Sequence, residues 1–164
     1  MIHLDIRTAG EKDVEKMVEI YNHYVRKTTV TFNTEEADTC QFLETFYADE
    51  EYYTLKALCE EDRIIGFCSL NPFNKKEAYR RSAYVSVYLL PEFTGRGFGK
   101  KALLYLEETA SSKNVHSLIA LICTENERSC GFFEKHGYRR VGELKQAGEK
   151  FGRLLDVVYY QKII

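Results

Sequence analysis

The stretch that decides the fold is YVSVYLLPEFTGRGFGKKALLYLEE, residues 84–108. It joins an alternating apolar run, typical of a strand, to an amphipathic run, typical of a helix. Three alternating glycines stand between the two runs: Gly95, Gly97 and Gly99. Glycine lets a backbone approach a ligand closely, and the unpaired amides that open a helix lie at the positive end of its dipole. Cationic side chains add to this charge: Arg96, Lys100 and Lys101. We therefore predict a phosphate-binding loop.

Two common nucleotide-binding patterns do not fit this loop. The Walker pattern G-x-x-x-x-G-K-[ST] fails because Thr94 stands where its first glycine belongs, and Lys101 stands where Ser or Thr is needed. The dinucleotide pattern G-x-G-x-x-G fails because the spacing here is G-x-G-x-G. A nucleotide-binding domain is therefore disfavoured. A pyrophosphate cradle is the favoured interpretation, and a glycine-rich turn with a frayed helix start is the alternative.

The pattern along the chain predicts one domain, residues 1–164, long enough to bury a sizeable core. Helices are expected at 11–25, 35–50, 97–114 and 126–138, the last of them ending at Gly137. Strands are expected at 3–9, 83–90, 116–123, 139–146 and 153–163, with a hairpin over 52–73 that turns at Glu61 and Asp62. The strand at 116–123 is nearly all apolar, as in strands buried on both faces. This order predicts an α/β (α+β) fold with a mixed sheet of about seven strands and helices on both faces.

Composition excludes several classes of protein. The formal net charge is -2, which implies no broad basic face for nucleic acid. The N-terminus is charged and broken by glycine, and no segment is long and apolar enough to span a bilayer. The five cysteines are odd in number and form no C-x-x-C pair, which is typical of reduced thiols and not of metal ligands. We expect a cytoplasmic protein with no metal and no nucleic-acid or membrane partner.

Several motifs carry a resemblance to a known family. TGRGFGKKAL, following VYLLPEF, resembles the acyl-CoA loop of the GCN5-related N-acetyltransferase (GNAT) family, written Q/R-x-x-G-x-G/A, and NERSCGFFEKHGYRRVGE resembles that fold's next helix. IYNHYVRKTTVTFNTEE, KEAYRRSAYVSVYLLPE and GEKFGRLLDVVYYQ are similar to the phosphinothricin and methionine-sulfone N-acetyltransferase subfamily. The resemblance runs from about Leu4 to Lys162. It implies the GNAT acyl-CoA N-acyltransferase fold, transfer of an acetyl group from acetyl-CoA to the amine of a small amino-acid-like acceptor, and a homodimer.

The resemblance also implies where acetyl-CoA would bind. The strand backbone of Val87, Tyr88 and Leu89 would hold the pantetheine arm and thioester, and the Leu89 amide would stabilise the oxyanion. The pyrophosphate would contact the loop: Gly95, Arg96, Gly97, Phe98, Gly99 and Lys100. Asn126 would bond the pantetheine. Thr94 departs from the Gln or Arg that usually begins the loop motif.

Acceptor-binding residues follow from the same resemblance. Tyr79 and Arg80, in EAYRRS, match the substrate loop, and Arg80 with Arg81 could bind a carboxylate or phosphinate in fork geometry. Lys150 and Arg153 match a turn near the acceptor pocket. A solvated arginine pair at a strand start and an ordinary hairpin are the alternative interpretations.

Two positions lack the expected proton-transfer groups. Tyr84 stands where the subfamily carries a glutamate base, and Phe133 stands where related enzymes place Tyr or His as the acid. A phenol is a poor base at neutral pH unless its pKa is displaced downward. Positioning and water chains could still allow transfer, and a thiolate tolerates the lack of an acid. His23 and Tyr88 are further candidates.

Three interpretations therefore remain open. The leading one is a small-molecule N-acetyltransferase in which Tyr84 and Leu89 are the catalytic candidates. The others are a protein N-acetyltransferase and an acyl-CoA-binding module with reduced or lost catalysis. The departures at Tyr84 and Phe133 favour the last of these.

Overall fold

The computed structural model describes residues 3–46 and 50–164, and within these residues seven strands form one sheet. The strands are β1 (Asp5–Thr8), β2 (Thr54–Glu60), β3 (Arg63–Pro72), β4 (Ser82–Leu89), β5 (Ser117–Cys123), β6 (Arg139–Lys150) and β7 (Arg153–Ile163). Their order across the sheet is β1-β2-β3-β4-β5-β7-β6. Among the described strands β4 and β5 form the one parallel pair, so the predicted mixed sheet is confirmed.

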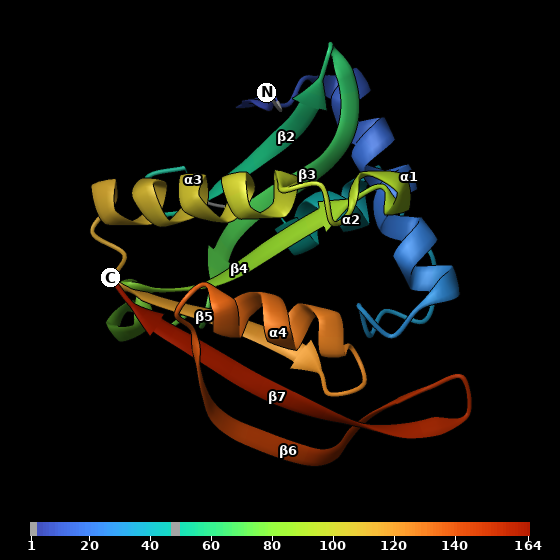
Figure 1. Cartoon of the computed structure of the whole chain (residues 1–164), viewed down its shortest axis with the longest axis vertical. Coiled ribbons are helices and arrows are strands. Elements are labelled where there is room, and N and C mark those ends of the chain that lie inside the picture. The colour runs from blue at the N-terminus through green and yellow to red at the C-terminus, as the bar shows by residue number, and fades with distance from the viewer. Residues whose placement is uncertain (1–2, 47–49) are drawn as a thin grey trace.

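Helices cover both faces of the sheet, as predicted. They are α1 (Glu11–Lys27), α2 (Thr39–Phe46), α3 (Phe98–Ser112) and α4 (Glu127–Lys135). Figure 1 shows α3 and α4 on the side of the sheet nearer the viewer. Their apolar side chains form one core with the sheet, while α1 and α2 form a second core on the opposite face against the first strands of the sheet. No helix in the described ranges is long and apolar enough to cross a membrane.

The second helix begins later than its sequence predicts. The sequence suggested a helix over 35–50, but α2 begins at Thr39, and residues 47–49 lie outside the described part of the chain. The buried amide of Asn22 donates to Ala37 O at 2.8 Å and accepts from Ala37 N at 2.9 Å, so it holds this segment out of the helix. Asp38 then caps α2, because its carboxylate accepts from Gln41 N at 2.8 Å.

The structure confirms the predicted turn and helix end and corrects the predicted burial of β5. The predicted turn at Glu61 and Asp62 is present, with φ of 48° and 64°, and Gly137 follows α4 with φ of 88°. Strand β5 is buried on the α3/α4 face, but Leu121 is 44% exposed on the other face, because α1 and α2 do not extend over β5. The prediction that β5 is buried on both faces is therefore wrong in part.

The sheet splits between β4 and β5. Among the described residues the two strands share three residue pairs: Ser82 with Ser117, Ala83 with Leu118, and Tyr84 with Ile119. Beyond Tyr84, β4 continues to pair with β3 and β5 continues to pair with β7. Figure 1 shows β4 and β5 diverging toward their C-terminal ends. One edge of β4, residues 85–89, therefore borders an opening in the sheet.

Candidate active site

The backbone of β4 presents polar groups to the split. Leu90 N donates to Ile65 O at 2.8 Å and Phe73 N donates to Ser82 O at 3.3 Å, so even-numbered residues of β4 bond to β3. Because bonding directions alternate along a strand, Val87 and Leu89 direct their N–H and C=O groups toward the split. The backbone of Tyr88 faces β3 instead, and its ring stacks on Phe67 in the α1/α2 core. Two of the three predicted strand residues therefore face a ligand position.

The glycine loop follows at the end of this open edge. Gly95 and Gly97 adopt φ of 76° and 87°, a left-handed conformation that side chains other than glycine rarely adopt. Gly97 is the N-cap of α3, and the bond from Lys101 N to Gly97 O, 3.2 Å long, begins the helical ladder. The amides of residues 98–100 precede that bond and point out of the helix start. The structure thus places the predicted amide cradle directly beyond the split.

Two arginines flank the loop in different ways. Arg96, within the loop, pairs with Glu60 at 3.2 Å, and its guanidinium lies 4.9 Å from the centre of the Phe93 ring. Arg128, on α4, donates from Nη1 to Thr94 Oγ1 at 2.9 Å. The loop therefore receives a cation from the opposite side of the split.

Asn126 lies at that opposite side, where β5 leads into α4. The side-chain Oδ1 of Asn126 accepts from Ser129 N at 3.2 Å and caps the helix, while the backbone N–H of Asn126 donates to Cys123 O at 2.9 Å. The side-chain NH₂ group points away from the capped amide and can donate to a ligand. The structure thus places Asn126 where a chain bound along β4 could meet it.

A depression of about 360 Å³ borders the same end of β5. Its lining comes from the end of α1 and the loop after it, from the β5–α4 junction and from the β6–β7 turn: Lys27, Thr28, Thr29, Val30, Glu125, Asn126, Phe151 and Arg153. We call it the acceptor pocket. Arg153 binds Glu125 with two bonds of 2.9 and 3.0 Å, and Thr29 Oγ1 donates to Glu125 at 2.7 Å. The Arg153 guanidinium, and then the Thr29 hydroxyl, lower the pKa of Glu125, so this carboxylate is ionised at neutral pH.

Comparison with known proteins identifies this arrangement. An acetyltransferase (GNAT) domain model matches residues 6–159. The chain belongs to the GNAT acetyltransferase family.

Individual relatives match over nearly their full lengths. Phosphinothricin N-acetyltransferase from Streptomyces coelicolor is 32% identical, with 97% of this chain and 95% of that protein covered. The structure of ribosomal-protein-alanine N-acetyltransferase from Brucella melitensis is 34% identical, with coverage of 98% and 99% and a TM-score of 0.89. The structure of yncA from Salmonella typhimurium with its cofactor acetyl-CoA is 29% identical, with coverage of 98% and 94% and a TM-score of 0.91.

In this GNAT chain the side chains at the two predicted proton-transfer positions, Tyr84 and Phe133, do not ionise near neutral pH. Tyr84 lies at the apex of the split, and burial, together with the neighbouring Tyr159, raises the pKa of Tyr84 to about 12. Phe133 is buried against Phe132 and Tyr138. The Tyr88 hydroxyl has a pKa raised by burial. Neither Tyr84 nor Tyr88 is a base at neutral pH.

Two predicted acceptor residues stand far from the acceptor pocket. Tyr79 and Arg80 precede β4, and the Arg80 guanidinium lies 4.8 Å from the centre of the Tyr52 ring. The acceptor pocket lies beyond the C-terminal end of β5, which runs parallel to β4, so the length of these strands separates it from Tyr79 and Arg80; eight residues at 3.3 Å each span roughly 26 Å. Within one chain, Tyr79 and Arg80 do not share a small ligand with Arg153.

Lys150, a predicted acceptor residue, is buried and bonds to the loop after α1. It is 3% exposed, and its ammonium donates to Thr31 O at 2.7 Å. The Phe32 ring lies directly over Gly148, where an added Cβ would stand 2.3 Å from a ring atom. These contacts fix the loop after α1 against the β6–β7 hairpin, so Lys150 supports the wall of the acceptor pocket.

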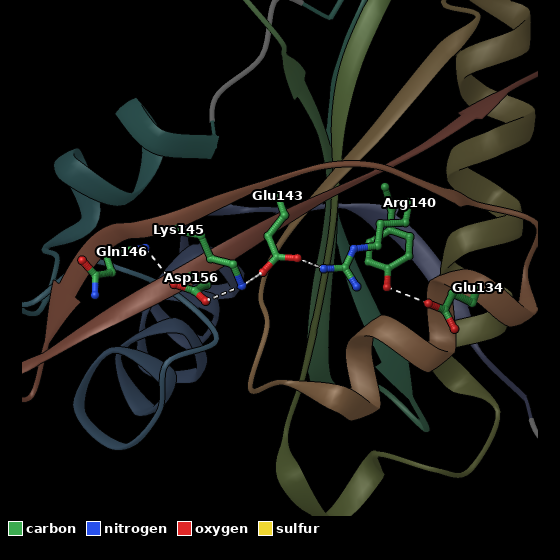
Figure 2. Close-up of polar contacts among 7 residues, drawn as sticks. Glu134, Arg140, Glu143, Lys145, Gln146 and Asp156 are labelled. Carbon is green, nitrogen blue, oxygen red and sulfur yellow. Dashed lines mark hydrogen bonds and ion pairs between the residues drawn. The ribbon is translucent and has the colours of Figure 1, made fainter.

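The hairpin is itself shaped by a charged side-chain network. Figure 2 shows Lys145 between Glu143 and Asp156, with Arg140 pairing Glu143 from the other side. The Asp156 carboxylate accepts from Gln146 N at 2.7 Å, and Gln146 has φ of 51° within an irregular part of β6. Asp156 therefore stabilises a bulge in β6.

The sequence did not point to three polar side chains of this GNAT site. Glu125 and Arg128 flank Asn126, and the Tyr24 hydroxyl donates to Leu89 O at the open edge of β4. The ring of His23, a predicted further candidate, packs edge-on against Tyr24. The proximity of Glu125 and Arg128 to Asn126 was a usable signal. Tyr24 offered none, because its contact joins residues 65 positions apart.

Proposed function

We propose that this protein transfers the acetyl group of acetyl-CoA to the amine of a small amino-acid-like acceptor, of the phosphinothricin or methionine-sulfone type. One observation carries the proposal. The split between β4 and β5 joins an amide-lined glycine loop to a pocket that contains a carboxylate and a guanidinium, Glu125 and Arg153. A thioester held in the split would face an amine held in the pocket.

The residues along the split fit acetyl-CoA. The pantetheine arm carries amide groups, and Val87 and Leu89 direct backbone donors and acceptors to the position where those amides would lie. Acetyl-CoA supplies an activated acetyl thioester and a thiol leaving group. The Leu89 N–H is the donor that we assign to the developing oxyanion, since it is a fixed backbone dipole at the open edge.

The chain contributes positioning more than proton transfer. An acceptor ammonium must lose a proton before it can attack, and Tyr84 cannot take that proton at neutral pH because its pKa is about 12. Glu125 is ionised and hydrogen-bonded, so it attracts an ammonium without being a strong base. The reaction therefore uses the neutral fraction of the acceptor amine, with water as the proton carrier.

The dimensions and charges of the pocket favour a small zwitterionic acceptor. A volume of about 360 Å³ falls in the range of small-ligand sites. Arg153 and Lys27 can bind a carboxylate, and Glu125 can bind an ammonium. A protein acceptor is the second candidate, since the Brucella relative is a ribosomal-protein-alanine N-acetyltransferase. The one observation that favours a protein acceptor is the 34% sequence identity between this chain and that relative.

We further propose a homodimer, in which a second copy supplies Tyr79 and Arg80 to the pocket. Three exposed apolar side chains, Leu121, Leu144 and Ile163, share the sheet face that α1 and α2 leave uncovered over β5, β7 and β6. Burial of such a face is a driving force for association. We also propose a single domain, residues 1–164, and a cytoplasmic location. The five free thiols support the location, because thiols stay reduced in the cytoplasm.

A thiol-release assay with acetyl-CoA tests the proposed activity. The acceptor panel contains phosphinothricin, methionine sulfone, unmodified amino acids and a peptide with a free N-terminus. Turnover is expected with one or more of the small acceptors. Turnover of the peptide alone would replace the small-molecule proposal by protein acetylation. If no acceptor reacts while acetyl-CoA binds in calorimetry, the non-catalytic binding module is the better account.

Mixed subunits test the homodimer. Arg80→Ala and Arg153→Ala are each expected to weaken acceptor turnover. If each pocket takes Arg80 from one copy and Arg153 from the other, mixing the two variants regenerates one intact pocket in each dimer that contains one copy of each variant. Recovered activity in the mixture supports the proposal. A mixture no more active than its two components, in a preparation shown to exchange subunits, contradicts it.

A further inference from the structure

We propose that Arg128 supplies the guanidinium that binds the pyrophosphate of acetyl-CoA, reaching the glycine loop from α4 although it lies outside the loop sequence. This inference rests on the proposed acetyl-CoA binding and names a residue for it. A guanidinium binds phosphate oxygens with two N–H groups at once. The backbone amides of the loop would bind the same phosphates from the α3 side.

The position of Arg128 is fixed by two contacts with the loop. Its Nη1 donates to Thr94 Oγ1 at 2.9 Å, while that hydroxyl donates to Pro91 O at 2.6 Å. Its Nη2 lies so close to Gly95 that an added Cβ there would stand 3.1 Å from it. Thr94 and Gly95 immediately precede the residues whose amides open α3. The guanidinium is therefore held at the entrance of the cradle.

The charge of Arg128 is available, whereas that of Arg96 is largely used. Arg96 pairs with Glu60 and also packs against the rings of Phe93 and Phe98. Within residues 3–46 and 50–164, no carboxylate lies within ion-pair distance of Arg128, and its side chain is exposed. An uncompensated cation beside a row of unpaired amides is the electrostatic environment that a pyrophosphate requires.

The neighbours of Arg128 also place its charge near the split. Burial raises the pKa of the Tyr24 hydroxyl, and the nearby charge of Arg128 opposes that rise; the same hydroxyl donates to Leu89 O on the open edge of β4. Arg128 belongs to the β5–α4 side, and Thr94 belongs to the β4–α3 side. A phosphate bound by both would join the two sides of the split. This role differs from that of a residue that only caps a turn.

Binding of three thioesters to Arg128→Met tests the assignment. The probes are acetyl-CoA, acetyl-dephospho-CoA, which lacks only the 3′-phosphate, and S-acetylpantetheine, which lacks every phosphate. Calorimetry is expected to show roughly tenfold weaker binding of the first two probes, because each loses a charge-assisted bidentate contact. Binding of S-acetylpantetheine is expected to be unchanged. Arg139→Met, an exposed arginine on β6, is the matched control for loss of a surface charge.

Each other outcome overturns the proposal. Equal weakening for all three probes would mean that Arg128 maintains the fold of the whole split and has no specific contact with a phosphate. Weakening confined to acetyl-CoA would assign Arg128 to the 3′-phosphate, and unchanged binding would exclude Arg128 from the site. A lack of acetyl-CoA binding by the wild-type protein would instead reject the proposed function, which keeps the two failures distinct.

A second-site variant provides a rescue. Thr94 Oγ1 touches the guanidinium of Arg128, so a long cationic side chain at position 94 can reach the same place. Thr94→Arg combined with Arg128→Met is expected to recover most of the lost acetyl-CoA affinity. Thr94→Leu with Arg128→Met is the uncharged counterpart and is expected to recover none. Recovery by both double variants, or by neither, contradicts a role based on charge.

Discussion

The glycine loop and the acceptor pocket lie at the same split but are built from different parts of the chain. The loop is one continuous segment, and its binding groups are backbone amides exposed by left-handed glycines. The pocket takes side chains from three segments that are more than twenty residues apart. A backbone cradle needs a particular chain path and tolerates changes of side chain, whereas a side-chain pocket keeps its shape while its specificity changes. The glycine loop therefore depends on its backbone path, and the acceptor pocket depends on the identity of its side chains.

The largest effect is expected where the backbone path itself is changed. Gly97→Val places a β-branched residue at a φ of 87°, a conformation that it rarely adopts, so the start of α3 must move. Acetyl-CoA binding is expected to weaken by at least roughly tenfold in calorimetry. Gly131→Ala, in the interior of α4 with open space around the added methyl, is the control and should bind normally. Wild-type affinity in Gly97→Val would refute the cradle.

A smaller effect, confined to the acceptor, is expected from the pocket. Arg153→Gln removes the bidentate partner of Glu125 and a cation for the acceptor carboxylate. The acceptor KM should rise roughly fivefold to tenfold, while the acetyl-CoA KM changes little. Arg139→Gln is the surface control. Equal increases in both KM values would mean that the two sites are not separable in the way described.

A change in stability is expected from the β6–β7 hairpin. Asp156→Asn weakens the bonds to Gln146 N and Lys145, the two causes that lower the pKa of Asp156. A carboxyl whose folded-state pKa is depressed stabilises the fold above its ordinary value of 3.8, and this contribution is lost as pH falls through the folded-state value. Thermal unfolding should show a lower Tm for the variant at neutral pH and converging curves in strong acid. A Tm difference that persists unchanged in acid would assign the effect to another cause.

The smallest effect is expected at the apex of the split, between the two sites. Tyr84→Phe should leave kcat/KM within roughly twofold, because a phenol with a pKa of about 12 takes no proton at neutral pH. The pH dependence of kcat/KM should instead follow the amine pKa of the acceptor, so two acceptors whose amine pKa values differ should give pH–rate profiles that are shifted relative to each other. Tyr84→Glu should raise activity near neutrality. A limb below pH 7 common to both acceptors, together with inactive Tyr84→Phe, would make Tyr84 or a group that it positions the base.

Local patterns in the sequence predicted the parts of the site that depend on local structure. The glycine spacing, the helix that starts at Asn126 and the Glu61–Asp62 turn all involve neighbours in the chain, and each is present. The late start of α2 depends on Asn22, fifteen residues from its partner Ala37, and no local pattern contains that bond. The Tyr24–Leu89 and Arg128–Thr94 contacts are likewise long-range. The resemblance to a family supplied the candidate acceptor residues but not the distance that separates Arg80 from Arg153.

The short seam between β4 and β5 has a mechanical consequence. Among the described residues, three residue pairs join the half-sheet that carries α1, α2 and α3 to the half-sheet that carries α4. A ligand that bonds to β4 and to the start of α4 adds a further connection between the two half-sheets. It should therefore slow amide exchange at Val87 and Leu89 and raise the Tm progressively as its free concentration rises above the Kd. The Tm of such a protein would then depend on the concentration of acetyl-CoA in the solution around it.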